Sequence, residues 1–404
     1  MKSIAGGVCA AKGFRAAGIH CGLRKNKTAK DLALIVSDVA ASAAAVYTQN
    51  LVKGAPLLVT KDNIADGKAQ AILCNSGNAN TCNADGIDIA TTMCALCAKE
   101  LHIPATDVVI ASTGVIGQPL PIAPIAAGMP SLVAELGYDK SLDAAQAIMT
   151  TDLAVKETAV SFEIGGTECR IGGIAKGSGM IHPNMATMLV FVTTDAAISP
   201  AMLQKALSND ILDTFNMVSV DGDTSTNDMV AVLANGMAGN TEITAEGAEY
   251  DAFCAALRAV TSYLCRQIAK DGEGATKLIT CAVTGASSDT IARTVAKSVI
   301  CSSLFKAAMF GADANWGRVL CAIGYAGVDV DINAVDVSFQ SAAGRVDVCK
   351  NGRGIPFSEE TAKTVLLEHE IDVLVCLNSG SSSATAWGCD LTYDYVKING
   401  DYRS

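Results

Sequence analysis

Short apolar runs alternate with alanine-rich segments along most of this chain, and that alternation constrains the fold more than any other feature. The segments between the apolar runs predict helices, at Ile87–Leu101, Leu142–Met149, Pro200–Leu212, Tyr250–Lys270 and Ser298–Phe310. The apolar runs themselves, rich in β-branched residues, predict strands, at Leu32–Val36, Leu57–Val59, Ala71–Leu73, Val108–Ala111, Thr187–Val192, Leu278–Val283 and Val373–Leu377. The pattern indicates an α/β to α+β protein built from layered sheets and helices.

The length of 404 residues exceeds what one ordinary hydrophobic core holds. Breaks near residue 200 and near Gly285 divide the chain into three expected parts, 1–200, 201–284 and 285–404. Half of the residues are hydrophobic and 18% are charged, which fits a compact protein with much buried surface.

The excess of acidic residues argues against some classes of binding partner. The formal net charge is −11, and such a field repels nucleic acid and anionic membranes. We therefore expect neither as a partner. A small anionic substrate would need local positive charge or well-placed amide groups.

Residues 108–134 carry no charge over 27 positions, a length that could cross a bilayer. Four prolines and three glycines interrupt this stretch, so it cannot form a continuous lipid-exposed helix. We interpret it as a buried strand followed by a packed loop.

The 15 cysteines are an odd number, and the residues from Met1 to Ala17 resemble no secretory or organellar leader. We expect reduced, mostly buried thiols in a cytoplasmic protein. Cys94 and Cys97 form a CxxC pair inside a predicted helix. Because no second ligand pair accompanies them, a place in the core is favoured over a metal or redox site.

Two polar, glycine-containing loops resemble ligand-binding loops only in part. Residues 271–277 (DGEGATK) lack the ending of a phosphate-binding loop. Residues 221–228 (DGDTSTND) lack the sixth-position glycine and the final glutamate of a calcium loop. We expect the second loop to be a turn that caps a helix starting near Asn227.

The segment 176–189 (KGSGMIHPNMATML) carries the chemistry. A glycine-bearing loop ends at the small residue Ala186, and the hydroxyl of Thr187 then opens a predicted strand. An autoproteolytic nucleophile needs this arrangement, because its hydroxyl must reach the preceding carbonyl through a strained backbone. Cleavage would leave Thr187 with a terminal amine that can serve as its own base. The alternative is that Thr187 simply begins a strand, as β-branched residues often do.

Ordered motifs over the whole chain resemble the ornithine acetyltransferase (glutamate N-acetyltransferase) family. Besides 176–189 they are residues 12–18 (KGFRAAG), 31–35 (DLALI), 75–80 (NSGNAN), 112–117 (STGVIG), 149–152 (MTTD), 221–228, 271–277, 312–318 (ADANWGR) and 398–404 (INGDYRS). The resemblance implies a layered, N-terminal-nucleophile-like catalytic region within 1–200, completed by 201–284, and an α+β domain over 285–404.

The resemblance also implies site residues. Thr187 would be both the processing residue and the acetyl acceptor, with cleavage after Ala186 into chains of 186 and 218 residues. Thr113 and Gly114 fall at the family's oxyanion hole, where a hydroxyl and a backbone N–H can donate to a developing oxyanion. The family's substrate contacts fall on Thr150, Lys176, Thr187, Glu273, Asn399 and Ser404.

The family's activity gives the expected function. Acetyl would pass from N-acetylornithine to Thr187 and then to glutamate, and acetyl-CoA serves some members as a donor. Lys176 could neutralise a substrate carboxylate and Glu273 could bind the cationic end of ornithine. No metal or redox cofactor is implied, and the processed chains would assemble as an α2β2 complex.

The chain departs from the family pattern at Leu153 and Ser404, where a threonine is expected. His182 stands five residues before Thr187 and is interpreted as a loop residue, because the terminal amine already supplies a base. Two rival functions remain. One is a related self-processing aminopeptidase or amidase, which passes the acyl group to water. The other is a non-catalytic small-molecule binding protein with the same fold.

Overall fold

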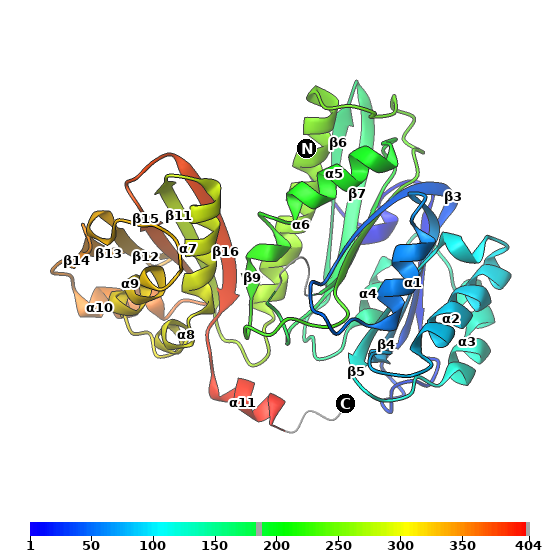
Figure 1. Ribbon diagram of the computed structural model, residues 1–404, viewed down its shortest axis with the longest axis horizontal. Helices are drawn as coiled ribbons and strands as arrows, with labels where there is room; N and C mark the ends of the chain where they lie inside the picture. Colours follow the sequence, from blue (N-terminus) through cyan, green and yellow to red (C-terminus); the bar gives the residue numbers. More distant parts are fainter. Residues whose placement is uncertain (183–187, 401–404) are drawn as a thin grey trace.

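The computed structural model describes residues 1–182 and 188–400. Its helices surround two sheets, which form two lobes, and the long helix α6 (Ala248–Lys270) packs on the larger sheet (Figure 1). Within the described residues the larger sheet has nine strands and the smaller sheet has seven.

The larger sheet is mixed. Its strand order is β1-β6-β7-β8-β10-β3-β4-β5, and β2 pairs with β3 beside this path. Neighbouring strands are antiparallel except β8 with β10 and β4 with β5, which are parallel. The strands are β1 (Lys2–Ile4), β2 (Phe14–Ile19), β3 (Leu32–Tyr47), β4 (Lys68–Asn78), β5 (Val108–Val115), β6 (Lys156–Ile164), β7 (Thr167–Lys176), β8 (Leu189–Thr194) and β10 (Met229–Ala234).

The side chains of β8 point alternately to its two faces, and each face packs against a different layer of this lobe. Val190 and Val192 pack into one core, beneath α5 and α6. Leu189 and Phe191 point the other way, into a second core that also contains residues of β4, β5 and α4. Successive side chains of a strand face opposite sides, so an entirely apolar run fits a strand buried on both faces. A third core lies between β4, β5 and the helices α2 and α3. The helices are α1 (Ala55–Asn63), α2 (Gly86–Leu101), α3 (Ile122–Ala134), α4 (Ser141–Ile148) and α5 (Pro200–Asp210).

The long strand β3 links the two halves of this sheet. Its first part pairs with β2 and β4, and its second part pairs with β10. The register with β4 shifts between Val36 and Ala41. An irregularity of this kind bends a strand, which lets one strand serve both halves.

The smaller sheet has the order β14-β13-β12-β15-β11-β16-β9 and forms a core with α7 to α10. Its strands are β9 (Val218–Ser219), β11 (Leu278–Ala286), β12 (Asp336–Ser341), β13 (Gly344–Lys350), β14 (Arg353–Gly354), β15 (Glu370–Cys376) and β16 (Ser382–Cys389). The helices are α7 (Asp289–Cys301), α8 (Ser303–Phe310), α9 (Trp316–Gly324) and α10 (Glu359–Leu366). Helix α11 (Tyr393–Asn399) leaves this lobe and runs back toward the first one (Figure 1).

The expected layered α/β class is confirmed, and most predicted elements are present with shifted ends. One predicted strand is wrong, because Leu57–Val59 lies inside α1, which begins beside Pro56. Proline is well suited to the first turn of a helix. Three apolar residues are too few to show whether the hydrophobic pattern repeats as in a helix or as in a strand. The strand predicted from Thr187 is described from Leu189 as β8.

Three further predictions need correction. The packed loop expected after the strand at Val108 contains helix α3, which tolerates Pro130 in its interior. The predicted helix Ser298–Phe310 is two helices, because Ser302 is extended and its hydroxyl caps α8. The segment after Asn227 is strand β10 and not a helix.

Within the described part of the chain, no helix is long and apolar enough to cross a membrane. The division into 1–200, 201–284 and 285–404 stays a prediction.

Candidate active site

One cavity of about 120 Å³ gathers most of the residues that the sequence analysis singled out. Of the predicted site residues, Ala186, Thr187 and Ser404 lie outside the described part of the chain. The predicted residues that line the cavity are Thr113, Gly114, Thr150, Lys176, Glu273 and Asn399. The rest of its wall comes from Ala79, Ile116, Thr151, Gly179, Met180, Ser225, Thr226, Asn227 and Asp228.

The Thr113–Gly114 pair lies near the end of β5. This strand runs parallel to β4, with Gly114 beside Gly77. A Cβ on Gly114 would lie 2.3 Å from the carbonyl carbon of Gly77, and the φ angle of Gly114 is +134°. Both facts require glycine here. Thr113 is 6% exposed at the cavity wall, so its hydroxyl and the following backbone are available to a small ligand.

Asp152 joins two parts of the cavity wall. One of its carboxylate oxygens accepts a hydrogen bond from the N–H of Thr150 at 3.0 Å, and the other accepts from Gly177 at 2.7 Å. Gly177 directly follows Lys176. The carboxylate therefore fixes the backbone on both sides of the cavity, at Thr150 and next to Lys176.

A buried ammonium extends this network. Lys156 is 1% exposed, and its Nζ lies 2.6 Å from a carboxylate oxygen of Asp152 and 2.6 Å from one of Asp271. Burial alone raises the pKa of the Asp152 carboxyl, but Lys156 and Lys176 outweigh it and hold the pKa below its usual range. The loop of Thr150 is thus tied to the loop that carries Glu273.

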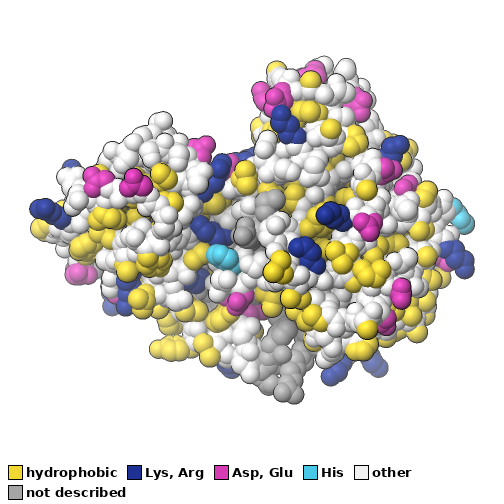
Figure 2. Space-filling view, viewed as in Figure 1, with side chains coloured by type: hydrophobic (Ala, Val, Ile, Leu, Met, Phe, Trp, Pro, Cys, Tyr) yellow, Lys and Arg dark blue, Asp and Glu magenta, His cyan; other side chains and the backbone are white. Residues whose placement is uncertain are grey.

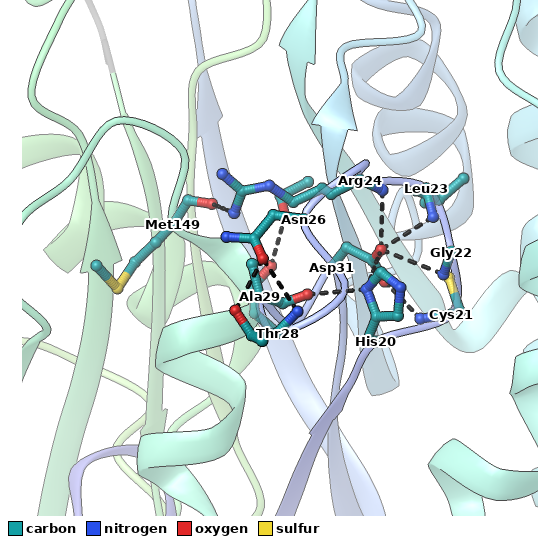
Figure 3. Close-up of polar contacts among 12 residues, drawn as sticks. His20, Cys21, Gly22, Leu23, Arg24, Asn26, Thr28, Ala29, Asp31 and Met149 are labelled. Carbon is teal, nitrogen blue, oxygen red and sulfur yellow. Dashed lines mark hydrogen bonds and ion pairs between the residues drawn. The ribbon is translucent and has the colours of Figure 1, made fainter.

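A second buried carboxylate holds a loop beside the cavity (Figure 3). Asp31 accepts hydrogen bonds from the backbone N–H groups of residues 21–24, at 2.6 to 3.3 Å. This places the guanidinium of Arg24 so that it donates to the carbonyls of Met149 (3.0 Å) and Thr150 (3.1 Å). Arg24 and Thr150 also line an adjoining cavity of about 540 Å³ that shares Gly114 with the first.

Glu273 enters the cavity because its neighbours leave it room. A Cβ on Gly179 would lie 2.3 Å from the Glu273 carboxyl carbon. The Glu273 N–H donates to the carbonyl of Ser178 at 2.9 Å. On the other side, Asn399 at the end of α11 donates its amide to the Glu273 carboxylate at 2.8 Å. Helix α11 therefore brings the C-terminal part of the chain to the site.

Residues 221–228 serve the site in a way that differs from the predicted helix cap. Asp221 accepts hydrogen bonds from the N–H groups of Met180 (2.6 Å) and Ile181 (2.9 Å). The buried Asn227 donates to the carbonyls of Ala79 (2.5 Å) and Ser112 (3.0 Å). The loop thus fastens three segments of the cavity wall together.

His182 lies outside the helices and strands, as expected of a loop residue, and is not part of the first cavity's described wall. Its Nδ1 lies 3.1 Å from the Ser219 hydroxyl and 3.5 Å from the Cys301 sulfur. Burial lowers the pKa of His182 to about 4, and Lys297 acts in the same direction. The imidazole is therefore neutral near pH 7. It lines a cavity of about 730 Å³ with residues of α7, and Lys and Arg side chains gather around the boundary between the lobes (Figure 2).

The cysteines are free thiols, as expected. Cys94 and Cys97 are buried in α2, and burial raises the pKa of each to about 12. Their predicted place in the core is confirmed. In the described residues no group of three or more His, Cys, Asp or Glu side chains could hold a metal ion.

Residues 15–404 match the model of the ArgJ family. The chain belongs to the ArgJ family. It is 51% identical over 406 residues to the arginine biosynthesis bifunctional protein ArgJ of Symbiobacterium thermophilum, covering 100% of both chains. The protein of the same name from Caldanaerobacter subterraneus subsp. tengcongensis is 50% identical over 394 residues, with 97% of each chain covered.

A crystal structure of an ArgJ family protein is also similar. The arginine biosynthesis bifunctional protein argJ of Bacillus halodurans is 48% identical, with a TM-score of 0.50. The match covers 52% of this chain and 98% of the solved one. Family membership agrees with the resemblance found in the sequence motifs.

Sequence reasoning missed several residues that line or support this cavity. They are Arg24, Asp31, Asp152, Lys156, Asn227 and Asp228. Most lie within or beside the motifs that carry the resemblance. Their position in such a motif was the one sign in the sequence that these residues could belong to the site. The sequence did not show which partner each residue contacts.

Proposed function

We propose that the chain transfers an acetyl group from N-acetylornithine to glutamate, holding it between the two steps as an ester on the Thr187 hydroxyl. As a member of the ArgJ family the chain is an enzyme of arginine biosynthesis. One observation carries the proposal. The Thr113–Gly114 pair shares a small cavity with Lys176 and Glu273, two side chains of opposite charge.

This charge arrangement suits an amino acid with a cationic side chain. The Lys176 ammonium would bind the α-carboxylate, and the Glu273 carboxylate would bind the ammonium at the other end. Glu273 is 8% exposed and already accepts one hydrogen bond from Asn399, so its direction is fixed before a ligand arrives.

Processing comes first. The Thr187 hydroxyl attacks the carbonyl of Ala186, and hydrolysis of the resulting ester leaves two chains, with Thr187 at the start of the second. The match to the Bacillus halodurans structure supports this step, because a solved chain that spans about half of this one is what separate processed chains would give.

Acetyl transfer then uses the new terminus. The Thr187 amine takes the proton of its own hydroxyl, and the oxygen attacks the acetyl carbonyl of the donor. Thr113 and the backbone at Gly114 stabilise the oxyanion, ornithine leaves, and the amine of glutamate attacks the acetyl ester. No step requires a metal or redox cofactor.

A second donor, acetyl-CoA, is supported by the adjoining cavity. That cavity opens beside Gly114 and Thr150, and its wall includes Arg24 and Lys25. Positive side chains next to the acyl site suit a larger donor that carries phosphate groups. The word "bifunctional" in the names of the relatives fits two donors.

An acetyl-transfer assay tests the proposal. Purified protein is incubated with glutamate and either N-acetylornithine or acetyl-CoA, and N-acetylglutamate is measured. We expect product with N-acetylornithine. Release of free acetate at a rate independent of glutamate would instead identify the aminopeptidase or amidase alternative. Ligand binding without turnover would identify a binding protein.

We further propose that the processed chains assemble as an α2β2 complex in the cytoplasm. Mass measurement under native conditions would show two copies of each chain, and an uncut monomer would contradict this assembly.

A further inference from the structure

Asp228 is a cavity residue to which the proposed mechanism assigns no role. It directly precedes β10, is 4% exposed and lines the same cavity as Thr113 and Lys176. Its Oδ2 is buried and has no hydrogen-bond partner among the described residues. The neighbouring Asn227 side chain, in contrast, is fully engaged in hydrogen bonds.

An unpartnered buried carboxylate oxygen is costly. Leaving such a group unsatisfied costs free energy, and buried polar groups are almost always hydrogen-bonded. A cavity-lining oxygen that lacks a protein partner is therefore a candidate contact for a ligand.

The strand pairing places Asp228 close to Met188. Strand β10 runs parallel to β8, with Met229 beside Leu189. The N–H of Met229 donates to the carbonyl of Met188 at 2.9 Å. Met188 is the residue that follows Thr187 in the sequence. Asp228 and Met188 therefore lie at the same end of the paired strands β10 and β8.

The surroundings set the charge of this carboxyl. Burial raises the pKa of Asp228 well above its usual range, while Lys176 and the Ser225 hydroxyl act in the opposite direction. The other charged group in the cavity wall is Glu273. The backbone carbonyl of Asp228 accepts a hydrogen bond from the N–H of Thr48 at 3.0 Å, and Thr48 does not titrate. A carboxyl with a raised pKa can both give and take a proton near neutral pH.

We propose that Asp228 is a further catalytic residue, which exchanges a proton with the substrate amine in both half-reactions. The inference rests on the proposed acetyl transfer. In the first half-reaction the C–N bond of N-acetylornithine breaks, and the neutral Asp228 carboxyl gives its proton to the departing nitrogen. Ornithine leaves as the neutral amine. Thr187 keeps the acetyl group as an ester, with its terminal amine protonated, and Asp228 is left as a carboxylate.

The second half-reaction restores both groups. Glutamate enters with a neutral amine, which forms the new C–N bond to the acetyl carbon. The nitrogen loses one proton to the Asp228 carboxylate as the amide forms. The C–O bond to Thr187 then breaks, and the oxygen regains its proton from the terminal ammonium of Thr187. Protons and charges balance over the cycle.

Two donors with different leaving groups test the proposal. The nitrogen of N-acetylornithine must be protonated to leave, whereas 4-nitrophenyl acetate releases a phenolate that needs no proton. Single-turnover acetylation of Thr187 is followed by intact mass for both. General acid catalysis typically contributes 10²- to 10⁴-fold. Asp228→Asn should slow acetylation by N-acetylornithine about a hundredfold and change acetylation by 4-nitrophenyl acetate less than about threefold.

Asp223→Asn is the matched control, because Asp223 is exposed in the same loop and its replacement makes the same exchange of a carboxyl group for an amide. It should leave both rates unchanged. An equal loss with both donors in Asp228→Asn, or no loss with either, would overturn the proposal. An uncut Asp228→Asn chain would also overturn it, because Asp228 would then serve processing and not the substrate amine.

The wild type gives a second test that needs no folded variant. The ratio of the two acetylation rates cancels the contribution of the Thr187 amine and reports the acid alone. The rate of acetylation by N-acetylornithine, divided by the rate with 4-nitrophenyl acetate, should fall as pH rises and Asp228 loses its proton. A ratio that does not change with pH would overturn the role of Asp228. Failure of the wild type to form an acetyl ester with either donor would instead contradict the proposed function itself.

Discussion

The Lys156 ammonium lies 2.6 Å from the Asp271 carboxylate, although 115 positions separate the two residues in the sequence. Lys156 pairs at the same distance with Asp152, which fixes the backbone of Thr150. Asp271 lies two residues before Glu273. One buried cation therefore holds two walls of the cavity in place.

Removal of this cation should destabilise the protein strongly. Lys156→Met leaves two carboxylates in a buried site without their counter-ion, and such losses cost about 3–5 kcal/mol. Chemical denaturation followed by circular dichroism measures the change. Lys205→Met is the matched control, because its ion pair with Glu246 is exposed and should contribute about 1 kcal/mol or less. Equal stability of the two variants would contradict the structural role of Lys156.

The ion pairs of Lys156 also predict how the stability of the protein depends on pH. The pKa of Asp152 is held below its usual range in the folded protein. Its contribution to the free energy of unfolding is therefore present above the usual aspartate pKa and is lost as pH falls through the lowered folded value. Stability measured from neutral pH downward should fall more steeply for the wild type than for Asp152→Asn. Parallel curves would show that Asp152 contributes nothing to the acid response.

Loss of the Thr113 hydroxyl should affect turnover and not folding. Thr113→Ala removes one donor to the oxyanion, which typically lowers kcat about ten- to a thousandfold. Steady-state kinetics measure the change, and thermal unfolding serves as the check on folding. Thr92→Ala, which removes an exposed hydroxyl bonded within α2, should leave kcat unchanged. Wild-type turnover in Thr113→Ala would remove this residue from the mechanism.

Neutralising Glu273 should weaken donor binding. Glu273→Gln keeps the shape of the side chain and loses the charge that we assign to the ornithine ammonium. The apparent affinity for N-acetylornithine should fall, while processing, which needs no substrate, should continue. A variant that fails to cleave but binds N-acetylornithine normally would make Glu273 a structural residue.

The sequence indicated the layered class because patterns within single segments decide it. Val190 to Val192 form an apolar run that suits a strand buried on both sides, and β8 is such a strand. Short runs gave less information. Leu57–Val59 has too few residues to distinguish a strand from a buried helical turn, and Ser302 divides two helices through its own hydroxyl cap.

The sequence predicted several residues that line the candidate site, but not the residues that hold its walls in place. Motifs with a known counterpart named Thr113, Lys176 and Glu273, and the structure brings these residues to one cavity. The partners of Lys156 and Arg24 depend on contacts between distant segments, which no local pattern reveals. Asp228 could not be predicted for the same reason, because it is singled out by a buried oxygen without a hydrogen-bond partner among the described residues.

The central claim is that one oxygen, the Thr187 hydroxyl, first cuts the chain and then carries the acetyl group. Intact-mass measurement of the purified wild type, Thr187→Ala and Thr187→Ser, combined with the transfer assay, tests it most directly. The wild type should be two chains of 186 and 218 residues, and Thr187→Ala a folded, uncut chain without transferase activity. Thr187→Ser retains an oxygen nucleophile without the methyl that restricts χ1, so it should cleave more slowly and keep measurable turnover. An uncut wild type that transfers acetyl, or a Thr187→Ala chain that is still cut before residue 187, would contradict the account.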